Sequence, residues 1–421
     1  MKYKIYTLGC KVNEYESEVM ADILENHGYT LDDNPDILVV NTCTVTNTAD
    51  NKSRKLIRSL RKNYPKSLLI VVGCMIQNKK EAIDIDADII IGNQNKTEII
   101  NYIKDYKNDT IVDIKDMDRA NFEDMKLDNF DLTRAYIKIQ DGCDNYCSYC
   151  IIPYVRGHVR CKKREDVLSE AKALVKNGHK EIVLTGIHTG NYHDGNYKFA
   201  DLLNDLVKIE GLKRLRISSV EITELNEDVL DVIEKNNVLV DHMHIPLQSG
   251  SDEILKLMNR KYNTDYFIKK ITKLKKIRPN ISITTDVIVG FPGEEEKHFL
   301  ETVNTIKKIG FTKIHVFPYS DREGTVASKM KNKVNGNIKK DRVKRLLALS
   351  KELEITNLHK NINRDIVFIP EVYRDGYLIG HTGDYLLIKA KGDEKYLSKE
   401  VLAKTKEVSY PYLISEVSVK Q

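Results

Sequence analysis

The N-terminal part of the chain alternates between short apolar runs and longer stretches with helical periodicity. The apolar runs predict strands at residues 4–7, 37–40, 68–72 and 87–91. The amphipathic stretches predict helices at residues 14–26, at residues 49–63 and after Asn95. Strands that alternate with helices are typical of parallel sheets, so this part predicts an open parallel α/β sheet with helices on both faces.

The same alternation resumes at residue 135. It predicts six more strands, at residues 135–138, 181–184, 215–218, 243–247, 281–288 and 313–316. Helices are predicted between them, for example at residues 164–176, 199–209 and 295–309. Six βα units are too few for a closed eight-stranded barrel, so a partial (β/α)6 barrel is expected, with its chemistry at the carboxyl ends of the strands.

The pattern changes again after a helix expected at residues 339–360. Short strands separated by Gly and Asp turns are predicted at residues 365–373, 377–382, 385–390 and 417–420. They indicate a small antiparallel β-barrel, near the lower size limit of an independent domain. The chain is therefore expected to consist of an N-terminal domain, a linker, the partial barrel, a basic helical connector and the C-terminal barrel, at residues 1–108, 109–133, 134–330, 331–363 and 364–421.

The composition is that of a globular protein, with 421 residues, 41% hydrophobic and 31% charged. No apolar run reaches the ~18 residues that a membrane-spanning helix needs. The first residues alternate like a strand and lack the apolar region of a signal peptide. We therefore expect a cytoplasmic protein with no membrane segment.

The net charge of +5 is unevenly distributed. Residues 329–364 contain eleven Lys and Arg but only three Asp and Glu. Such a segment suggests a polyanion partner such as nucleic acid, although a solvated helix face is an equally open interpretation. The C-terminal barrel is not basic overall, but it carries tyrosines that could stack on unpaired bases or form its core.

Cys143, Cys147 and Cys150 (the barrel triad) follow the first strand of the partial barrel with the spacing Cys-x₃-Cys-x₂-Cys. Three thiolates can hold three irons of a [4Fe–4S] cluster and leave the fourth iron open to a ligand. Zinc with a distant fourth ligand, or three reduced thiols without a metal, are the alternatives. Zinc more often takes paired Cys-x₂₋₄-Cys knuckles, so the spacing favours the cluster.

Cys10, Cys43 and Cys74 (the N-terminal triad) follow the first, second and third predicted strands of the N-terminal sheet. Ligands collect beyond the carboxyl ends of strands in such sheets, so the three thiols should converge in one crevice. They would form a second three-cysteine site if they hold a cluster, although each alone could be a small buried apolar residue. The seventh cysteine, Cys161, is expected not to be a ligand.

The motifs around both triads are specific. The N-terminal triad lies in TLGCKVNEYES, NTCTVTNTAD and VGCM, and KIQDGC and IIPY flank the barrel triad. These motifs resemble those of the radical S-adenosylmethionine (SAM) methylthiotransferases, and the resemblance covers essentially the whole chain. It implies two [4Fe–4S] clusters, one on each triad, with SAM at the open iron of the barrel cluster. It also implies a C-terminal RNA-binding barrel of the TRAM type.

The resemblance also suggests which residues contact SAM. Thr185 and Gly186 end the second barrel strand, where the backbone of the family meets the methionine moiety. Glu221, Gln248 and Gly290 follow the third, fourth and fifth strands and are further candidates. No catalytic side chain is expected, because the clusters carry the chemistry in this family.

The motifs are most similar to the branch of the family that acts on threonylcarbamoyladenosine. The resemblance thus implies transfer of a methylthio group to C2 of this nucleoside at position 37 of tRNA, with tRNA and an electron donor such as flavodoxin or ferredoxin as partners. The enzymatic alternatives are isopentenyladenosine in tRNA and an aspartate of a ribosomal protein. The non-enzymatic alternative is an iron–sulfur protein that binds RNA as a regulator.

Overall fold

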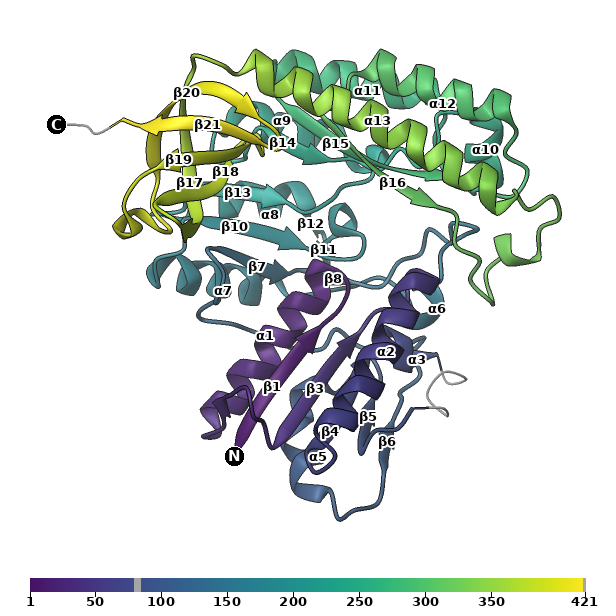
Figure 1. Ribbon diagram of the computed structural model, residues 1–421, viewed down its shortest axis with the longest axis vertical. Coiled ribbons are helices and arrows are strands. Elements are labelled where there is room, and N and C mark those ends of the chain that lie inside the picture. The colour runs from purple at the N-terminus through teal and green to yellow at the C-terminus, as the bar shows by residue number, and fades with distance from the viewer. Residues whose placement is uncertain (79–84, 419–421) are drawn as a thin grey trace.

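The computed structural model describes residues 1–78 and 85–418 (Figure 1). Its N-terminal sheet has six parallel strands in the order β2-β1-β3-β4-β5-β6. These strands are β1 (Lys2–Thr7), β2 (Thr30–Leu31), β3 (Ile37–Thr42), β4 (Leu68–Gly73), β5 (Ile89–Ile91) and β6 (Ile111–Asp113). The helices are α1 (Lys11–Asn26), α2 (Asn47–Asn63), α3 (Cys74–Gln77), η1 (Lys96–Glu98) and α5 (Ile99–Asp105). The four predicted strands are confirmed, and the short edge strands β2 and β6 were not predicted.

Helices cover both faces of this sheet because its central strands are apolar on both sides. Val39 and Ile70 pack with α1 and α5, whereas Leu38 and Leu69 pack with α2 on the opposite face. Every residue of β3 is buried. Continuous apolar strands of this kind are typical of parallel sheets enclosed between helices.

The central part is the predicted partial barrel. Its six strands are β7 (Arg134–Lys138), β10 (Glu181–Thr185), β13 (Arg214–Ile217), β14 (His242–His244), β15 (Ser282–Val289) and β16 (Lys313–Pro318). They form two parallel three-stranded sheets, β7-β10-β13 and β14-β15-β16, which a parallel bridge between Leu215 and Leu239 connects. The main helices of this part are α7 (Arg164–Lys176), α8 (Phe199–Leu206), α9 (Glu227–Lys235), α10 (Asp252–Leu257), α11 (Thr264–Ile277) and α12 (Glu296–Ile309). All six predicted strands are confirmed.

Shorter elements lie in the loops of the partial barrel. They are β8 (Gln140–Asp141), α6 (Ile152–Arg156), β9 (Arg160–Cys161), η2 (Thr189–Asn191), β11 (His193–Asp194), β12 (Tyr197–Lys198), η3 (Ile222–Glu224) and η4 (Ala327–Lys329). The pair β8 and β9 is antiparallel and encloses the loop that carries the barrel triad.

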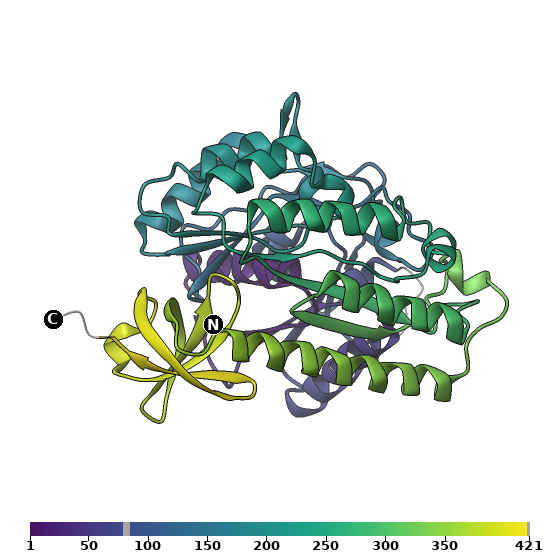
Figure 2. The same ribbon diagram turned by 90° about the horizontal axis from the view of Figure 1, so that it is seen from above.

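The long helix α13 (Gly336–Lys360) packs against β16 and leads into the C-terminal barrel (Figure 2). This closed five-stranded barrel has the order β17-β18-β19-β21-β20. Its elements are β17 (Asp365–Arg374), β18 (Tyr377–Thr382), β19 (Leu387–Lys391), η5 (Glu394–Tyr396), β20 (Val401–Ser409) and β21 (Tyr412–Val417). The strand pairs are antiparallel except β19 with β21, which is parallel.

Two predictions for the C-terminal barrel were wrong. The prediction omitted β20, whose inward positions are Val401, Ala403 and Thr405, because small and polar inward residues weaken the apolar signal. It also placed a strand at residues 417–420, whereas β21 ends at Val417 and residues 419–421 lie outside the described part of the chain.

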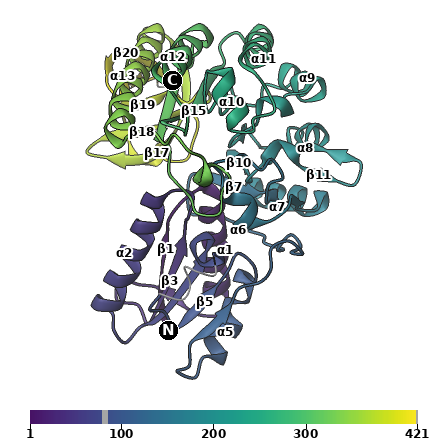
Figure 3. The same cartoon turned by 90° about the vertical axis from the view of Figure 1, so that its right-hand side faces the viewer.

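The N-terminal sheet lies against one side of the central barrel (Figure 3). Tyr15 and Val19 of α1 belong to the same apolar core as the barrel strands. The Tyr15 hydroxyl lies 2.8 Å from Glu170 Oε1, on α7. The two parts therefore share a core rather than only a surface contact. In residues 1–78 and 85–418, no helix combines the length and the apolarity that crossing a membrane requires.

Candidate functional site

Backbone hydrogen bonds fix the loop that carries the barrel triad. The Cys143 N–H donates to Gly157 O at 3.0 Å, and the Ser148 N–H donates to Met258 O at 3.1 Å. Gly142 precedes the triad with φ +74°, and a Cβ at this position would lie 1.9 Å from the backbone oxygen of His158. Only glycine fits there, because neither the backbone angle nor the space admits a side chain.

Cationic and titratable side chains surround the barrel triad. Arg260 Nη1 lies 3.3 Å from Cys147 Sγ, and the same guanidinium contacts the Glu221 carboxylate. Burial lowers the pKa of His188, but hydrogen bonds to Cys143 and to a glutamate outweigh it and raise that pKa to about 10. Positive charge at these positions stabilises thiolates, which are the form of cysteine that binds metals.

At least one thiol in each triad has a clearly raised pKa. Burial, followed by the like charges of the neighbouring thiols, raises the pKa of Cys150 to about 12. Burial raises the pKa of Cys43, in the N-terminal triad, to about 12 as well. A buried thiol with such a pKa stays protonated at neutral pH unless a metal replaces the proton.

The N-terminal triad comes together as the sheet topology predicts. Cys10 precedes α1 directly, Cys43 follows β3, and Cys74 begins α3. A Cβ at Gly9 would lie 3.1 Å from Cys43 Sγ, so the first two motifs are in contact. All three cysteines line one cavity.

Arg156, the last residue of α6, joins the two triads. Its side chain is fully buried. Nε lies 3.1 Å from Cys74 Sγ, and Nη2 donates to Asn13 Oδ1 at 2.9 Å. Nη1 lies 3.1 Å from Glu16 Oε1 and 3.0 Å from Asp141 Oδ1. One guanidinium thus connects the helix after the barrel triad with the N-terminal triad.

Further buried charges complete this network. Lys138 Nζ lies 2.7 Å from both Glu16 Oε1 and Asp141 Oδ2, and Lys96 also contacts Glu16. Burial acts to raise the pKa of both carboxyls, but the surrounding cations outweigh it and hold both pKa values well below the usual range. Arg160 also lies 3.7 Å from Asp141, so four cations face the two carboxylates, and one of these cations, Arg156, contacts the N-terminal triad. An anionic group bound there would be favoured electrostatically.

The donor sets fit iron–sulfur clusters better than single ions. Among the described residues, no group of three or more His, Cys, Asp or Glu side chains is arranged to hold one metal ion. A cluster differs from a single ion because each thiolate binds a different iron of the cube. Each triad also has a guanidinium at one sulfur, which compensates the negative charge of a thiolate-bound cluster.

A cavity of about 910 Å³ lies where the three parts of the chain meet. The N-terminal triad lines it from one side, and Thr185 and Gly186 line it from the barrel strands. The turn between β18 and β19 of the C-terminal barrel closes a third side. The volume lies within the range of sites that bind small molecules or single nucleosides.

The other candidate SAM contacts lie outside the lining of this cavity. Glu221 is paired with Arg260 near the barrel triad. Gln248 has φ +62°, and its N–H donates to a backbone oxygen on β15 at 2.8 Å. A Cβ at Gly290 would lie 2.2 Å from Cγ of Lys339, so the packing of α13 explains this glycine. The roles of all five residues in SAM binding stay predictions.

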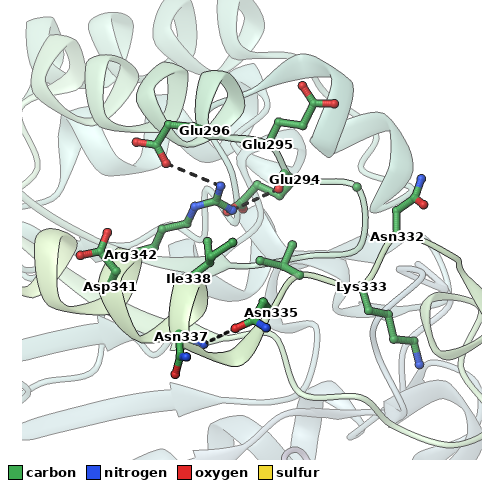
Figure 4. Close-up of a pocket in the computed structure, with 12 residues that line it drawn as sticks. Glu294, Glu295, Glu296, Asn332, Lys333, Asn335, Asn337, Ile338, Asp341 and Arg342 are labelled. Atoms are coloured by element: carbon green, nitrogen blue, oxygen red, sulfur yellow. Dashed lines mark hydrogen bonds and ion pairs between the residues drawn. The ribbon is translucent and has the colours of Figure 1, made fainter.

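A second hollow, of about 870 Å³, lies beside α13 and is drawn in Figure 4. Arg342 reaches across it to Glu294 Oε1 at 2.6 Å and to Glu296 at 3.6 Å. Arg345 is paired with Glu296, and Lys333 is paired with an aspartate. The positive charge of the basic connector is therefore partly neutralised within the molecule.

Several cavity residues were not predicted as parts of the site. Lys11, Arg216 and Tyr385 line the cavity but come from three separate parts of the chain. Lys11 follows Cys10 directly, and this adjacency was the one available signal. Nothing in the local sequence indicates that the turn before β19 folds onto the barrel.

Comparisons with known proteins agree with this architecture. Residues 137–306 match the family model of the Radical SAM superfamily, and residues 2–92 match that of an uncharacterized protein family, UPF0004. The solved structure of the radical SAM methyltransferase TsrM from Kitasatospora setae has a TM-score of 0.54 at 15% identity, over 75% of this chain and 72% of that one. The cobalamin-dependent radical enzyme OxsB has a TM-score of 0.52 at 13% identity, over 84% and 56%. At these identities the likeness shows the fold alone.

Curated relatives are similar over nearly the full length. The chain is 42% identical to threonylcarbamoyladenosine tRNA methylthiotransferase MtaB of Bacillus subtilis, over 97% of this chain and 94% of the relative. The Thermotoga maritima protein of the same name is 38% identical over 91% and 90%. A tRNA-2-methylthio-N(6)-dimethylallyladenosine synthase of Clostridium botulinum is 36% identical over 84% and 82%. The chain therefore belongs to the methylthiotransferase family of the radical SAM superfamily.

Proposed function

We propose that the protein transfers a methylthio group to C2 of N6-threonylcarbamoyladenosine at position 37 of tRNA. The observation that carries this proposal is the cavity at the junction of the three parts, lined by the N-terminal triad and by barrel strand ends. The 42% identity to an MtaB enzyme over 97% of the chain supports the choice of substrate over isopentenyladenosine and over a ribosomal-protein aspartate.

The radical SAM family implies a [4Fe–4S] cluster and SAM. We propose that the barrel triad holds this cluster and that the N-terminal triad holds a second one. When bound, these groups supply the one-electron chemistry that activates an aromatic C–H bond and delivers the methylthio sulfur. An unactivated C–H bond offers no acid–base route, which is why the proposed reaction needs radical chemistry.

The side chains of the protein hold and orient these groups. Arg260 neutralises charge at Cys147, and Thr185 and Gly186 present the strand-end backbone to SAM. Arg156 keeps the two triads in a fixed relation.

We propose a separate role for each domain. Residues 1–108 hold the second cluster, residues 134–330 hold the first cluster and SAM, and residues 331–363 and 364–421 contact tRNA. An adenine in the anticodon loop can turn out of its stack at low cost and enter the cavity. An electron donor such as flavodoxin or ferredoxin is the proposed reductant, and a cytoplasmic location is consistent with both partners.

The experiment that tests this proposal uses protein purified and reconstituted without oxygen. Two [4Fe–4S] clusters require about eight irons per chain. The protein, SAM and a reductant are incubated with tRNA that carries threonylcarbamoyladenosine, and the digested nucleosides are analysed by mass spectrometry for the methylthio product. A preparation with eight irons that cleaves SAM but never modifies this tRNA would contradict the proposal.

Cysteine variants separate the two sites. Cys147→Ala should abolish formation of 5′-deoxyadenosine, whereas Cys43→Ala should retain it and lose only the methylthio product. Cys161→Ser is the matched control and should retain both activities, because Cys161 belongs to neither triad. If both alanine variants stop SAM cleavage while they remain folded, the assignment of the triads is wrong.

A further inference from the structure

One end of the cavity is built around Tyr385, in the turn before β19. Its ring stacks on His242 at 4.7 Å and on His381 at 4.5 Å between ring centroids, with interplanar angles of 22° and 25°. The guanidinium groups of Arg134 and Arg216 lie 5.4 Å and 4.9 Å from the centroid of the same ring. The C-terminal barrel thus places an aromatic side chain among cations contributed by the partial barrel.

Two polar atoms at this end are buried and lack a partner. Nη1 of Arg216 and Nδ1 of His242 have no hydrogen bond within the described residues, although both side chains line the cavity. The remaining nitrogens of Arg216 are occupied, with Nε 2.7 Å from Glu181 Oε1 and Nη2 3.2 Å from Gly383 O. The Arg216 Nη1 group is always a donor, and Nδ1 of the neutral His242 ring is a donor when Nε2 accepts from Thr284. A buried guanidinium donor without a partner is costly, so its presence on a cavity wall indicates a ligand that accepts hydrogen bonds.

The local potential is positive. Burial acts to raise the pKa of Tyr385, yet Arg134 and the nearby cations Lys11 and Arg216 outweigh it and lower that pKa. Lys11 is partly buried and makes no ion pair in the part of the chain that the structure describes.

Carboxylates also line the cavity, and two of them already have partners. Asp286 lies 3.3 Å from His244, and Glu354 lies 3.1 Å from Lys313. Glu14 also lines the cavity and attracts Lys11 electrostatically, but the two side chains form no direct ion pair. Near Tyr385, Arg134 is paired with Glu371 and Arg216 with Glu181, so Lys11 is the cation that has no ion pair among the described residues.

We propose that Lys11, Arg216 and His242 bind the carboxylate of the threonylcarbamoyl group. This inference rests on the proposed function and names the residues that select its substrate. A carboxylate accepts a hydrogen bond from Arg216 Nη1, accepts one from His242 in the tautomer that is protonated on Nδ1, and lies beside the cation Lys11. A dimethylallyl group would leave Arg216 Nη1 unsatisfied. Lys11 directly follows Cys10 of the N-terminal triad. A nucleoside whose carboxylate binds Lys11 therefore has its adenine near that triad.

The test compares three anticodon stem–loop RNAs with the reconstituted holoenzyme. Position 37 carries threonylcarbamoyladenosine, its methyl ester or unmodified adenosine, and binding constants and kcat/KM are measured. The wild-type enzyme should bind the acid about tenfold or more tightly than the ester. Lys11→Met should lose about tenfold or more on the acid and almost nothing on the ester, and Lys11→Arg should restore binding of the acid.

Lys313→Met is the matched control, since Lys313 lines the same cavity but is paired with Glu354. It should not change the ratio of acid to ester. Iron content and SAM cleavage of Lys11→Met should match the wild type, which separates this role from cluster binding. Equal losses on all three RNAs would assign Lys11 to an RNA phosphate and overturn the inference. Absence of product with every RNA in the wild type would instead refute the proposed function, and the binding constants would still decide this inference.

Discussion

The buried guanidinium of Arg156 offers the sharpest test of how the two triads are held together. In Arg156→Met, a side chain of similar length loses its charge and all five polar contacts at 2.9–3.1 Å to Cys74, Asn13, Glu16 and Asp141. The two carboxylates remain buried; Glu16 keeps its lysine partners, and Asp141 keeps Lys138 and the more distant Arg160.

Removing one partner from a buried ion pair costs about 3–5 kcal/mol, because the remaining charge stays desolvated. A cooperative unit of about 300 residues has an unfolding entropy of roughly 0.6 kcal/mol/K, so the melting temperature should fall by about 5–8 °C. The loss should be smaller in the double variant Glu16→Gln/Arg156→Met than the two single losses added together, because the two groups are in contact.

The same substitution should also affect the metal content. Iron should fall from about eight towards four per chain after reconstitution, because the N-terminal triad loses its compensating charge while the barrel triad keeps Arg260. Calorimetry and iron analysis provide the two measurements. Arg164→Met is the control, since Arg164 is half exposed in its pair with Asp205 and should change stability by less than about 1 kcal/mol. A variant that melts within about 1 °C of the wild type and keeps eight irons would refute the network argument.

Two further substitutions test local features. Gly142→Ala should prevent binding of the barrel cluster, because its Cβ would meet the backbone oxygen of His158 at 1.9 Å, whereas Gly195→Ala, at φ +60° with open space, should bind it normally by absorbance and iron analysis. Glu18→Gln should raise the melting temperature at pH 8 but not at pH 5, since burial and Asp131 raise the pKa of Glu18 to about 7. A raised carboxyl pKa lowers stability as the pH rises from about 4.3 to 7, so an equal effect at both pH values would contradict this assignment.

The sequence predicted those parts of the fold that depend on local periodicity. All ten predicted strands of the N-terminal sheet and the partial barrel are confirmed, because short segments with strand-like apolar patterns alternate there with clear helices. The edge strands β2 and β6 were missed, since two or three residues are too few to form a pattern. β20 was missed because its inward side chains include Ala403 and Thr405, which carry little hydrophobic signal.

The part of the candidate site that lies at the edge of the N-terminal parallel sheet was predictable from the sequence. The N-terminal triad follows from the rule that the carboxyl ends of parallel strands lie at one edge of a sheet. The contribution of the C-terminal barrel was not predictable, because Tyr385 reaches the cavity through contacts with Arg134 and His242, which are far away in sequence. Buried charges such as Lys138 and Asp141 were also overlooked, since lysines and aspartates are usually solvent-exposed.

The short helix α6 lies between the two triads. It begins two residues after Cys150 and ends at Arg156, which contacts Cys74. A helix of five residues extends only about 7 Å, so a single rigid turn of chain separates the two triads. Ile151, Ile152 and other apolar side chains fill the space between them in one cluster that includes cysteines of both triads. The contact between Arg156 and Cys74 and the packing of this cluster hold the two triads near each other. A reaction in which one carbon must meet chemistry from both sides requires this arrangement, since a displacement of about 1 Å can cost a large factor in rate.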